Sequence, residues 1–410
     1  MADVRPFCAI RPRADLVREF AALPYDVFDR KEARMFVREH PGSFLAIDRP
    51  ETQFPEDQDM YAPEVYAKAH DLLWERVERG DLIKESSPAY YLYEQTWNGR
   101  TQTGIVACAS IDDYRDGVVK KHENTRRDKE EDRVRHVDAC DAQTGPIFLC
   151  FRRDGIIAQI VSSVKETEPV YDFTSHDSTK NRIWIIDKAL DIQTLRERFT
   201  AMQAIYIADG HHRCASAVRV GQARREAAGV TGGLESDHFL SVLFPEDELA
   251  ILDYNRVVRD LNGLDAGGFL DALAGAFIVE EADAPVSPER KGVFGMYLDG
   301  RWYRLFARPE RISDDAVECL DVAYLQRELL APVLGIDDPK TDTRIDFVGG
   351  VRGLAELERR CRTDMRVAFS MHPTSLQELF AVADAGRLMP PKSTWFEPKL
   401  LSGLFIHALR

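Results

Sequence analysis

The stretch that decides the fold of this 410-residue chain is residues 204–213, AIYIADGHHR. Its apolar first half, Ala204–Ala208, predicts a buried strand, and Asp209-Gly210 breaks this strand before a helix predicted to run to about Gly229. Glycine permits the tight turn between the two elements. A strand followed by a helix brings backbone N–H groups and the positive helix end to one point, so we expect a phosphate-handling turn here.

The side chains of this turn suit an anionic ligand. His211, His212 and Arg213 can donate hydrogen bonds at the predicted start of the helix, where phosphate oxygens bind well. Asp209, at the end of the strand, could accept a proton or hold a metal. The alternative is an ordinary capped helix, with Asp209 as the N-cap and two surface histidines. Adjacent histidines point roughly 100° apart on a helix and make poor joint ligands, so we predict no metal-binding residues.

A second segment with basic character covers residues 120–136, within a highly charged helix predicted over 116–140. Its basic residues recur at three- and four-residue spacing and could share one helical face: His122, Arg126, Lys129, Arg133 and His136. One interpretation is a solvated face linked by salt bridges to neighbouring acids. The other is a cationic wall that faces phosphate groups, with Glu123 as a carboxylate beside it and Thr125 in the same run.

A third segment is the turn at 23–27, LPYDV. A proline followed by an aromatic residue and an acid makes a rigid turn that can present Asp26. Most such turns are structural. This one nevertheless adds Asp26 to Asp209 and Glu123 as a candidate catalytic carboxylate.

Composition and charge limit the classes of function. The chain is 44% hydrophobic and 30% charged with a formal net charge of −15, which disfavours a general nucleic-acid-binding protein. We find no apolar run of membrane-spanning length and no secretory signal, so we expect a cytoplasmic protein without a membrane partner. Seven scattered cysteines without a C-x-x-C pair argue against a structural zinc site or a disulfide framework. The P-loop, zinc-protease and α/β-hydrolase motifs are also missing.

The order of elements predicts an α/β protein, α+β mixed in detail, with two domains. Residues 1–262 form the predicted core, with an amphipathic helix between Pro63 and Gly80 and a hairpin that turns at Asn98-Gly99. Residues 263–410 form a predicted C-terminal α+β lobe, whose tail packs back on the core. Further strands of the core are expected over 146–151, 157–164, 239–244 and 249–258, the last two as a pair.

Several segments together resemble one known family. They are Leu23–Val27, Pro41-x-Ser43-Phe44-Leu45, Lys121-His122-Glu123-x-Thr125 with Lys129 and Asp132-Arg133, Gly145–Phe148, Ala208–Arg213, and Pro390–Thr394 with Phe396 and Pro398-Lys399. The combination resembles the uncharacterised bacterial and archaeal family catalogued as domain of unknown function 1015 (DUF1015). The resemblance covers nearly the whole chain, and the combination is specific although each piece alone is not.

The Asp-Gly-His-His-Arg turn also resembles the signature of free L-serine kinases, which belong to the ParB/sulfiredoxin superfamily. This resemblance implies a ParB/sulfiredoxin-like mixed-sheet core to which the C-terminal lobe is added, and a catalytic or metal-linked Asp209. The residues that it implies for phosphate binding, together with those of the second segment, are Gly210, His211, His212, Arg213, His122, Thr125, Lys129 and Arg133. The serine kinases also use a glutamate from their N-terminal region, and either Asp26 or Glu123 takes that place here.

The resemblance leads to two hypotheses on function. The first is a nucleotide-dependent phosphotransferase, a kinase that uses ATP or ADP with Mg²⁺ on a small hydroxylated metabolite such as free serine. The second is a regulatory protein of the ParB-like superfamily that senses a nucleotide or metabolite without turnover. A ParB-like DNA-binding protein is a third interpretation, which the net charge of −15 disfavours. The sequence is compatible with a homo-oligomer, and histidine protonation predicts a site that is sensitive to pH near neutrality.

Overall fold

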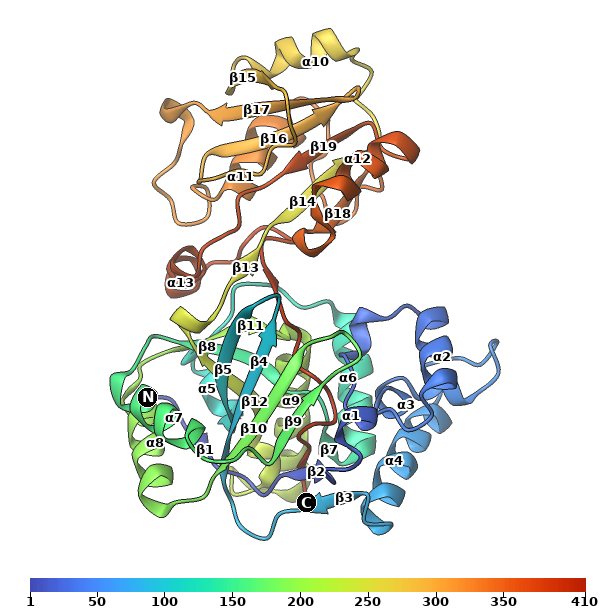
Figure 1. Ribbon diagram of the computed structural model, residues 1–410, viewed down its shortest axis with the longest axis vertical. Helices are drawn as coiled ribbons and strands as arrows, with labels where there is room; N and C mark the ends of the chain where they lie inside the picture. The colour runs from blue at the N-terminus through green and yellow to red at the C-terminus, as the bar shows by residue number, and fades with distance from the viewer. The chain divides into compact units, whose positions relative to one another are not determined.

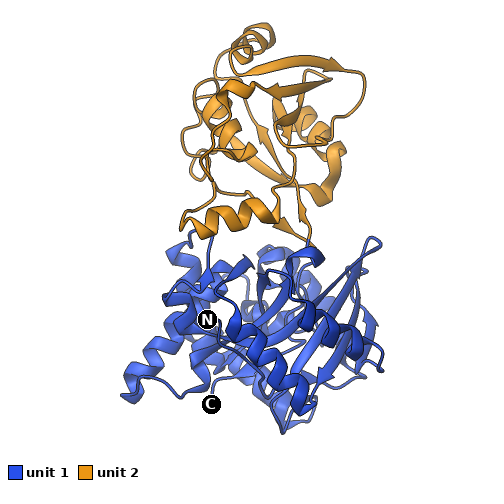
Figure 2. Cartoon of the chain, turned by 90° about the vertical axis from the view of Figure 1, so that its left-hand side faces the viewer, with its two compact units in different colours: residues 1–249, 398–410 blue, residues 250–397 orange.

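The computed structural model describes residues 1–410 and divides the chain into two compact units. Unit 1 comprises residues 1–249 and 398–410, and unit 2 comprises residues 250–397 (Figure 2). The boundary therefore differs from the predicted domains 1–262 and 263–410. It lies earlier because the strands at 251–258 pair within unit 2, and the chain re-enters unit 1 at Pro398.

Unit 1 is built around a nine-stranded sheet (Figure 1). In spatial order its strands are β6 (Val119–Lys120), β11 (Ile205–Asp209), β8 (Ile147–Phe151), β12 (His238–Pro245), β5 (Arg100–Ser110), β4 (Tyr90–Trp97), β10 (Lys180–Ile186) and β9 (Tyr171–Thr174), and β1 (Val4–Arg5) pairs with β5. β11 is parallel to β6 and β12 is parallel to β8, whereas the other neighbours are antiparallel. This mixed sheet confirms the predicted mixed α/β class.

The helices of unit 1 enclose two apolar clusters. They are α1 (Val17–Phe20), α2 (Arg30–Glu39), α3 (Leu45–Asp48), α4 (Pro63–Glu78), α5 (Ile111–Arg115), α6 (Arg127–Cys140), α7 (Gly155–Lys165), α8 (Ala189–Ala201) and α9 (His211–Ala228). Helix α9 packs against α6, and α6 packs against α4. Two small sheets complete the unit: β2 (Ile10–Pro12) with β3 (Leu82–Lys84), and β7 (Ala142–Gln143) with β21 (His407–Ala408).

Several predicted elements of unit 1 are confirmed. The hairpin of β4 and β5 places Trp97 opposite Arg100, and both turn residues, Asn98 and Gly99, have positive φ. Helix α4 has its proline in the first turn, as predicted. β11 and α9 follow one another with the single residue Gly210 between them, which is the predicted strand–turn–helix.

Three predictions for unit 1 were wrong. Residues 157–164 lie in helix α7, because the side chain of Asp154 accepts the N–H groups of Ile156 and Ile157 and so starts a helix. The charged helix predicted over 116–140 begins only at Arg127, since residues 116–126 form a turn after α5, strand β6 beside β11 and a loop. The strands predicted at 239–244 and 249–258 do not pair with each other; β12 pairs with β5 and β8 instead.

Unit 2 contains a six-stranded antiparallel sheet with helices around it. In spatial order the strands are β15 (Phe277–Ala282), β17 (Arg301–Ala307), β16 (Val293–Leu298), β19 (Val367–Ser370), β14 (Tyr254–Val258) and β18 (Ile345–Gly349), and β13 (Ile251–Leu252) pairs separately with β20 (Trp395–Phe396). The helices are α10 (Ala266–Leu273), α11 (Asp321–Leu325), α12 (Gly353–Thr363) and α13 (Leu376–Asp384). Leu298 pairs with Arg301, so Asp299 and Gly300 form the turn between β16 and β17.

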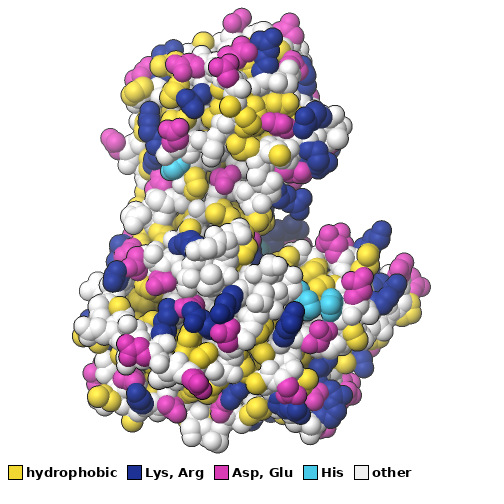
Figure 3. Space-filling model, in the orientation of Figure 1, with side chains coloured by type: hydrophobic (Ala, Val, Ile, Leu, Met, Phe, Trp, Pro, Cys, Tyr) yellow, Lys and Arg dark blue, Asp and Glu magenta, His cyan; other side chains and the backbone are white.

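The charged side chains of the surface are of both signs. Figure 3 shows acidic and basic side chains interspersed over one face of the molecule. None of the helices combines the length and apolarity that crossing a lipid bilayer requires.

Candidate phosphate-binding site

The turn between β11 and α9 has no side-chain cap. Gly210 occupies the N-cap position with φ 92° and ψ 32°, a conformation that favours glycine. Asp209 Oδ1 accepts the N–H of Gly210 at 2.8 Å, and it caps no N–H group within the helix. The alternative of an ordinary helix capped by Asp209 is therefore wrong. The first turn of α9 keeps its N–H groups without a side-chain acceptor and carries two histidines and an arginine.

Asp209 is paired with a lysine from the far end of the chain. Lys399 Nζ lies 3.1 Å from Asp209 Oδ2, and the side chains are 18% and 33% exposed. Burial would raise the pKa of Asp209, but Lys399 and Arg213 together hold it below its usual value. Asp209 is therefore an ionised carboxylate next to two cations. Sequence reasoning missed Lys399 as a site residue, although the Pro398-Lys399 motif contained it.

His122 and His211 form a buried pair beside this carboxylate. Their rings meet edge to face with centroids 4.5 Å apart, and the backbone N–H of His122 donates to His211 Nε2 at 3.4 Å. This bond leaves Nδ1 as the protonated nitrogen of a neutral His211, and Glu123 Oε2 lies 3.9 Å from it. Burial lowers the pKa of His122 to about 4 and that of His211 well below its usual value. Both rings are therefore neutral at pH 7.

His212 lies on another side of α9. Its Nε2 accepts the backbone N–H of Arg126 at 2.9 Å, so its Nδ1 carries the proton when the ring is neutral. Burial lowers the pKa of His212, against a raising influence from the charge of Asp26. The predicted sensitivity to pH near neutrality therefore has no support in His122, His211 or His212, since burial moves all three below their usual range.

Arg213 and Arg133 meet at a small cavity. Arg213 Nη1 donates to the carbonyl of Pro146 at 2.7 Å, and its guanidinium lies over the turn at Gly210. Arg133 forms an ion pair with Asp132 at 2.8 Å and lies 4.0 Å from the ring centroid of Tyr25. The cavity that both arginines line measures about 30 Å³, which is room for one or two water molecules and too little for a nucleotide.

The remaining predicted residues are more dispersed. Thr125 donates to Glu130 at 2.8 Å and thereby ties the loop before α6 to that helix. Lys129 is exposed on α6 without a hydrogen bond or ion pair to the cluster, and Asp26 is exposed on the short helix Tyr25–Val27. The predicted single face over 122–136 does not form, because His122 and Arg126 precede α6 and His136 points to the carbonyl of Ile47 at 3.0 Å.

Fold and site together define a class: a two-unit mixed α/β protein in which the uncapped turn between β11 and α9 gathers His122, His211 and Arg213 with the Asp209–Lys399 pair. The chain belongs to the family described as "Protein of unknown function (DUF1015)". The model of that family matches residues 4–323, which confirms the resemblance derived from the motifs.

Several solved structures are similar to the chain at low sequence identity. A free serine kinase in complex with AMP is 13% identical, with 72% of this chain and 86% of that chain covered and a TM-score of 0.36. SbnI with a C-terminal truncation from Staphylococcus aureus is 12% identical, with 72% and 85% covered and a TM-score of 0.38. A conserved hypothetical protein from Pyrococcus furiosus is 13% identical, with 73% and 94% covered and a TM-score of 0.33. Comparison with curated proteins finds no significant match.

Proposed function

We propose that this protein is a nucleotide-dependent phosphotransferase, a kinase that uses ATP or ADP with Mg²⁺ to phosphorylate a small hydroxylated metabolite, with free serine as a candidate acceptor. The observation that carries the proposal is the uncapped first turn of α9 beside the Asp209–Lys399 pair. Free N–H groups at a helix start attract anionic oxygens, and the cationic side chains of Lys399 and Arg213 add to that attraction. The proposal assigns this turn to a phosphate group of the nucleotide.

The residues of the turn supply what phosphoryl transfer requires of a protein. The reaction depends on neutralising charge, aligning the reactants and orienting the attacking hydroxyl, with little covalent chemistry. Arg213 and Lys399 neutralise charge in the proposal, and the backbone N–H groups of α9 position the phosphate. The carboxylate of Asp209 suits Mg²⁺, which binds through one or two carboxylates together with substrate phosphates and water.

The carboxylate that takes the proton of the attacking hydroxyl is Asp209, Glu123 or Asp26 in this proposal. Asp209 is ionised and lies between the cations, whereas Glu123 is 3.9 Å from the ring of His211. Asp26 acts on His212 through its charge from the exposed helix Tyr25–Val27. Separate Asp209→Asn, Glu123→Gln and Asp26→Asn variants distinguish the three, because loss of the base removes the acidic limb of the pH–rate profile.

The direct test is to incubate the purified full chain with ATP or ADP, Mg²⁺, serine and a pool of hydroxylated metabolites, and to search for phosphorylated product by mass spectrometry. We expect product from the native chain and none from Arg213→Ala. Arg219→Ala is the matched control, since Arg219 lies on the same helix but pairs with Glu130 and Glu131. Equal turnover in Arg213→Ala and the native chain would overturn the proposal.

A second experiment, combined with the product assay, separates the kinase from a regulatory protein. A calorimetric titration with ATP and ADP measures binding without regard to turnover. Nucleotide binding that Arg213→Ala weakens, with no product from any acceptor, would identify a sensor of nucleotides at the same turn. Absence of both binding and product would remove both functions.

A further inference from the structure

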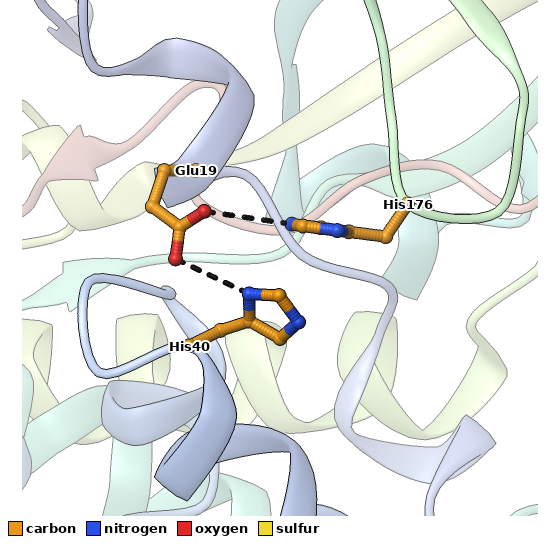
Figure 4. A group of neighbouring side chains, drawn as sticks. All are labelled: Glu19, His40 and His176. Carbon is orange, nitrogen blue, oxygen red and sulfur yellow. Dashed lines mark ion pairs between the residues drawn. The ribbon is translucent and has the colours of Figure 1, made fainter.

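Three side chains that metals favour converge on unit 1 away from the phosphate-binding turn. They are Glu19 on α1, His40 at the C-terminal end of α2 and His176 in the loop between β9 and β10 (Figure 4). One ligand atom from each of them lies within 4.8 Å of the other two. Two imidazoles and one carboxylate are a ligand set that recurs in zinc sites with an open position.

The distances match those of a shared cation. His40 Nδ1 is 3.3 Å from Glu19 Oε1, and His176 Nε2 is 3.8 Å from Glu19 Oε2. Ligands that sit about 2.0–2.1 Å from a tetrahedral metal are themselves about 3.4 Å apart. The two His–Glu distances are therefore within a few tenths of an ångström of this spacing, and the two imidazoles offer ligand nitrogens within 4.8 Å of each other. The side chains of Glu19, His40 and His176 are 49%, 28% and 32% exposed, which leaves solvent access for a water as fourth ligand.

The rings are held in place by packing. Phe36, one turn before His40 on α2, contacts both histidines, with ring centroids 4.6 Å from His40 and 5.5 Å from His176. The two imidazole centroids are 4.3 Å apart. Glu19 passes over Gly42, where a Cβ atom would lie 3.0 Å from Glu19 Cγ. The approach of the carboxylate to His40 thus depends on a glycine in the turn that follows it.

The loop that carries His176 is fixed by a buried hydrogen-bond network. Ser175 and Thr179 both donate to Asp177, at 2.5 and 2.7 Å. Asn181 donates to Ser175 at 3.0 Å and accepts from Tyr93 at 2.8 Å, and the side chain of Asn181 is buried in the sheet. A ligand on such a loop loses little entropy when it binds a metal, because its backbone is already ordered.

From this geometry we propose that Glu19, His40 and His176 bind one divalent transition-metal ion, Zn²⁺ or a close relative in the Irving–Williams series, with water in the fourth position. Imidazole ligands favour such ions over Mg²⁺ and Ca²⁺, which prefer oxygen ligands. The alternative is a pair of ordinary His–Glu contacts, in which each imidazole pairs with one oxygen of Glu19. A single metal satisfies all three groups, and this inference is independent of the proposed kinase.

The test is calorimetric titration of the full chain with Zn²⁺ in the presence of excess Mg²⁺, paired with Co²⁺ titration followed by visible absorption. We expect one site per chain and a Co²⁺ spectrum of low coordination number. His176→Ala and Glu19→Gln should each weaken Zn²⁺ binding by roughly 100-fold or more, since each removes a ligand from the metal. Glu19→Gln changes little besides charge, which guards against loss of fold in the alanine variant.

The matched control is His70→Ala. His70 lies 3.2 Å from Asp71, an exposed histidine–carboxylate pair that belongs to no three-residue cluster. Its loss should leave the Zn²⁺ affinity and the Co²⁺ spectrum unchanged. Three results would overturn the proposal. The native chain could fail to bind Zn²⁺, His176→Ala and Glu19→Gln could both keep the Zn²⁺ affinity of the native chain, or His70→Ala could lose as much Zn²⁺ affinity as these two variants.

Discussion

Helices α9 and α13 each follow a strand of a central sheet, in unit 1 and unit 2 respectively, but their first turns are closed in opposite ways. In α13 the hydroxyl of Ser375 accepts the N–H of Glu378 at 3.2 Å, and Glu378 accepts the N–H of Ser375 at 2.8 Å. This capping box satisfies two backbone donors and places an acid at the positive helix end. The first turn of α13 is thus closed by side chains of its own helix start.

In α9 the N-cap position and the first turn carry neither a capping side chain nor an acid. Gly210 offers no cap, the first turn contains no acid, and it carries His211, His212 and Arg213. A cation at a helix N-terminus opposes the helix dipole, so this arrangement sacrifices stability. The nearby carboxylate of Asp209 is taken by the N–H of Gly210 and by Lys399. The comparison teaches that the first turn of α13 is closed by its own side chains, whereas the first turn of α9 leaves its N–H groups to water or, in the proposed function, to an anion.

The largest expected effect comes from Asp209. Asp209→Asn should lower turnover by roughly 10³-fold, because it removes the ionised carboxylate that the proposal uses for Mg²⁺ or for the hydroxyl proton. Steady-state assay of phosphorylated product measures this loss. Asp172→Asn is the control, since Asp172 forms a 3.4 Å pair with Lys180 on the neighbouring strand of the same unit. Comparable losses in both variants would show that the effect is structural.

The second effect is on acid stability and concerns the buried ring of His122. Its folded pKa of about 4 lies below the ordinary value of 6.5, so the unfolded chain takes up the proton first. Stability is therefore intact above pH 6.5 and falls as pH drops toward 4, by up to about 3 kcal/mol from this group. Denaturation midpoints measured from pH 7.5 to 4.5 check the direction. His122→Gln should make the stability less dependent on pH, whereas the control His70→Gln, at an exposed histidine, should not. Identical pH curves for the native chain and both variants would contradict the prediction.

The third effect tests the glycine that keeps α9 open. A Cβ at Gly210 would lie 3.1 Å from Arg213 Nε at a φ of 92°, so Gly210→Ala should cost about 1–2 kcal/mol and displace the guanidinium. We expect nucleotide affinity to fall about tenfold, because one charge-assisted hydrogen bond to phosphate is lost. Gly229→Ala, at the other end of the same helix with φ 66° and nothing within 4 Å, should cost stability alone. If Gly210→Ala and Gly229→Ala bound the nucleotide with equal affinity, Gly210 would have no specific role in nucleotide binding.

Elements with a strong local signal could be predicted from the sequence. The strand–turn–helix at 204–229 and the hairpin at Asn98-Gly99 were correct because glycine and apolar runs define them without tertiary help. The isoleucine and valine residues that dominate 156–164 predict a strand, but the cap at Asp154 outweighs their β propensity and starts helix α7. The basic run after 116 could not reveal that β6 pairs with β11 and ends the helical pattern there.

The turn at the centre of the candidate site could be located from the sequence, but the side chains that contact this turn from elsewhere in the chain could not. The turn residues were identified from their order in the chain, but Lys399 is separated from Asp209 by 190 positions, and no local pattern connects them. The neutrality of His122 and His211 arises from burial against each other, which spacing cannot show. The glutamate and two histidines at positions 19, 40 and 176 were missed because each one stands alone in the sequence.

The smallest effect is expected at the closed helix. Ser375→Ala removes the acceptor for the N–H of Glu378 and should lower the stability of unit 2 by about 1 kcal/mol, measured as a shift of its thermal or denaturant midpoint. Nucleotide affinity should stay the same, because α13 has no donors reserved for a ligand. Ser163→Ala on the exposed face of α7 provides the control, where alanine should stabilise slightly through its higher helix propensity. If Ser375→Ala weakened nucleotide binding as much as Gly210→Ala, the capped and uncapped helices would not differ in role, and the assignment of the anion to α9 would lose its basis.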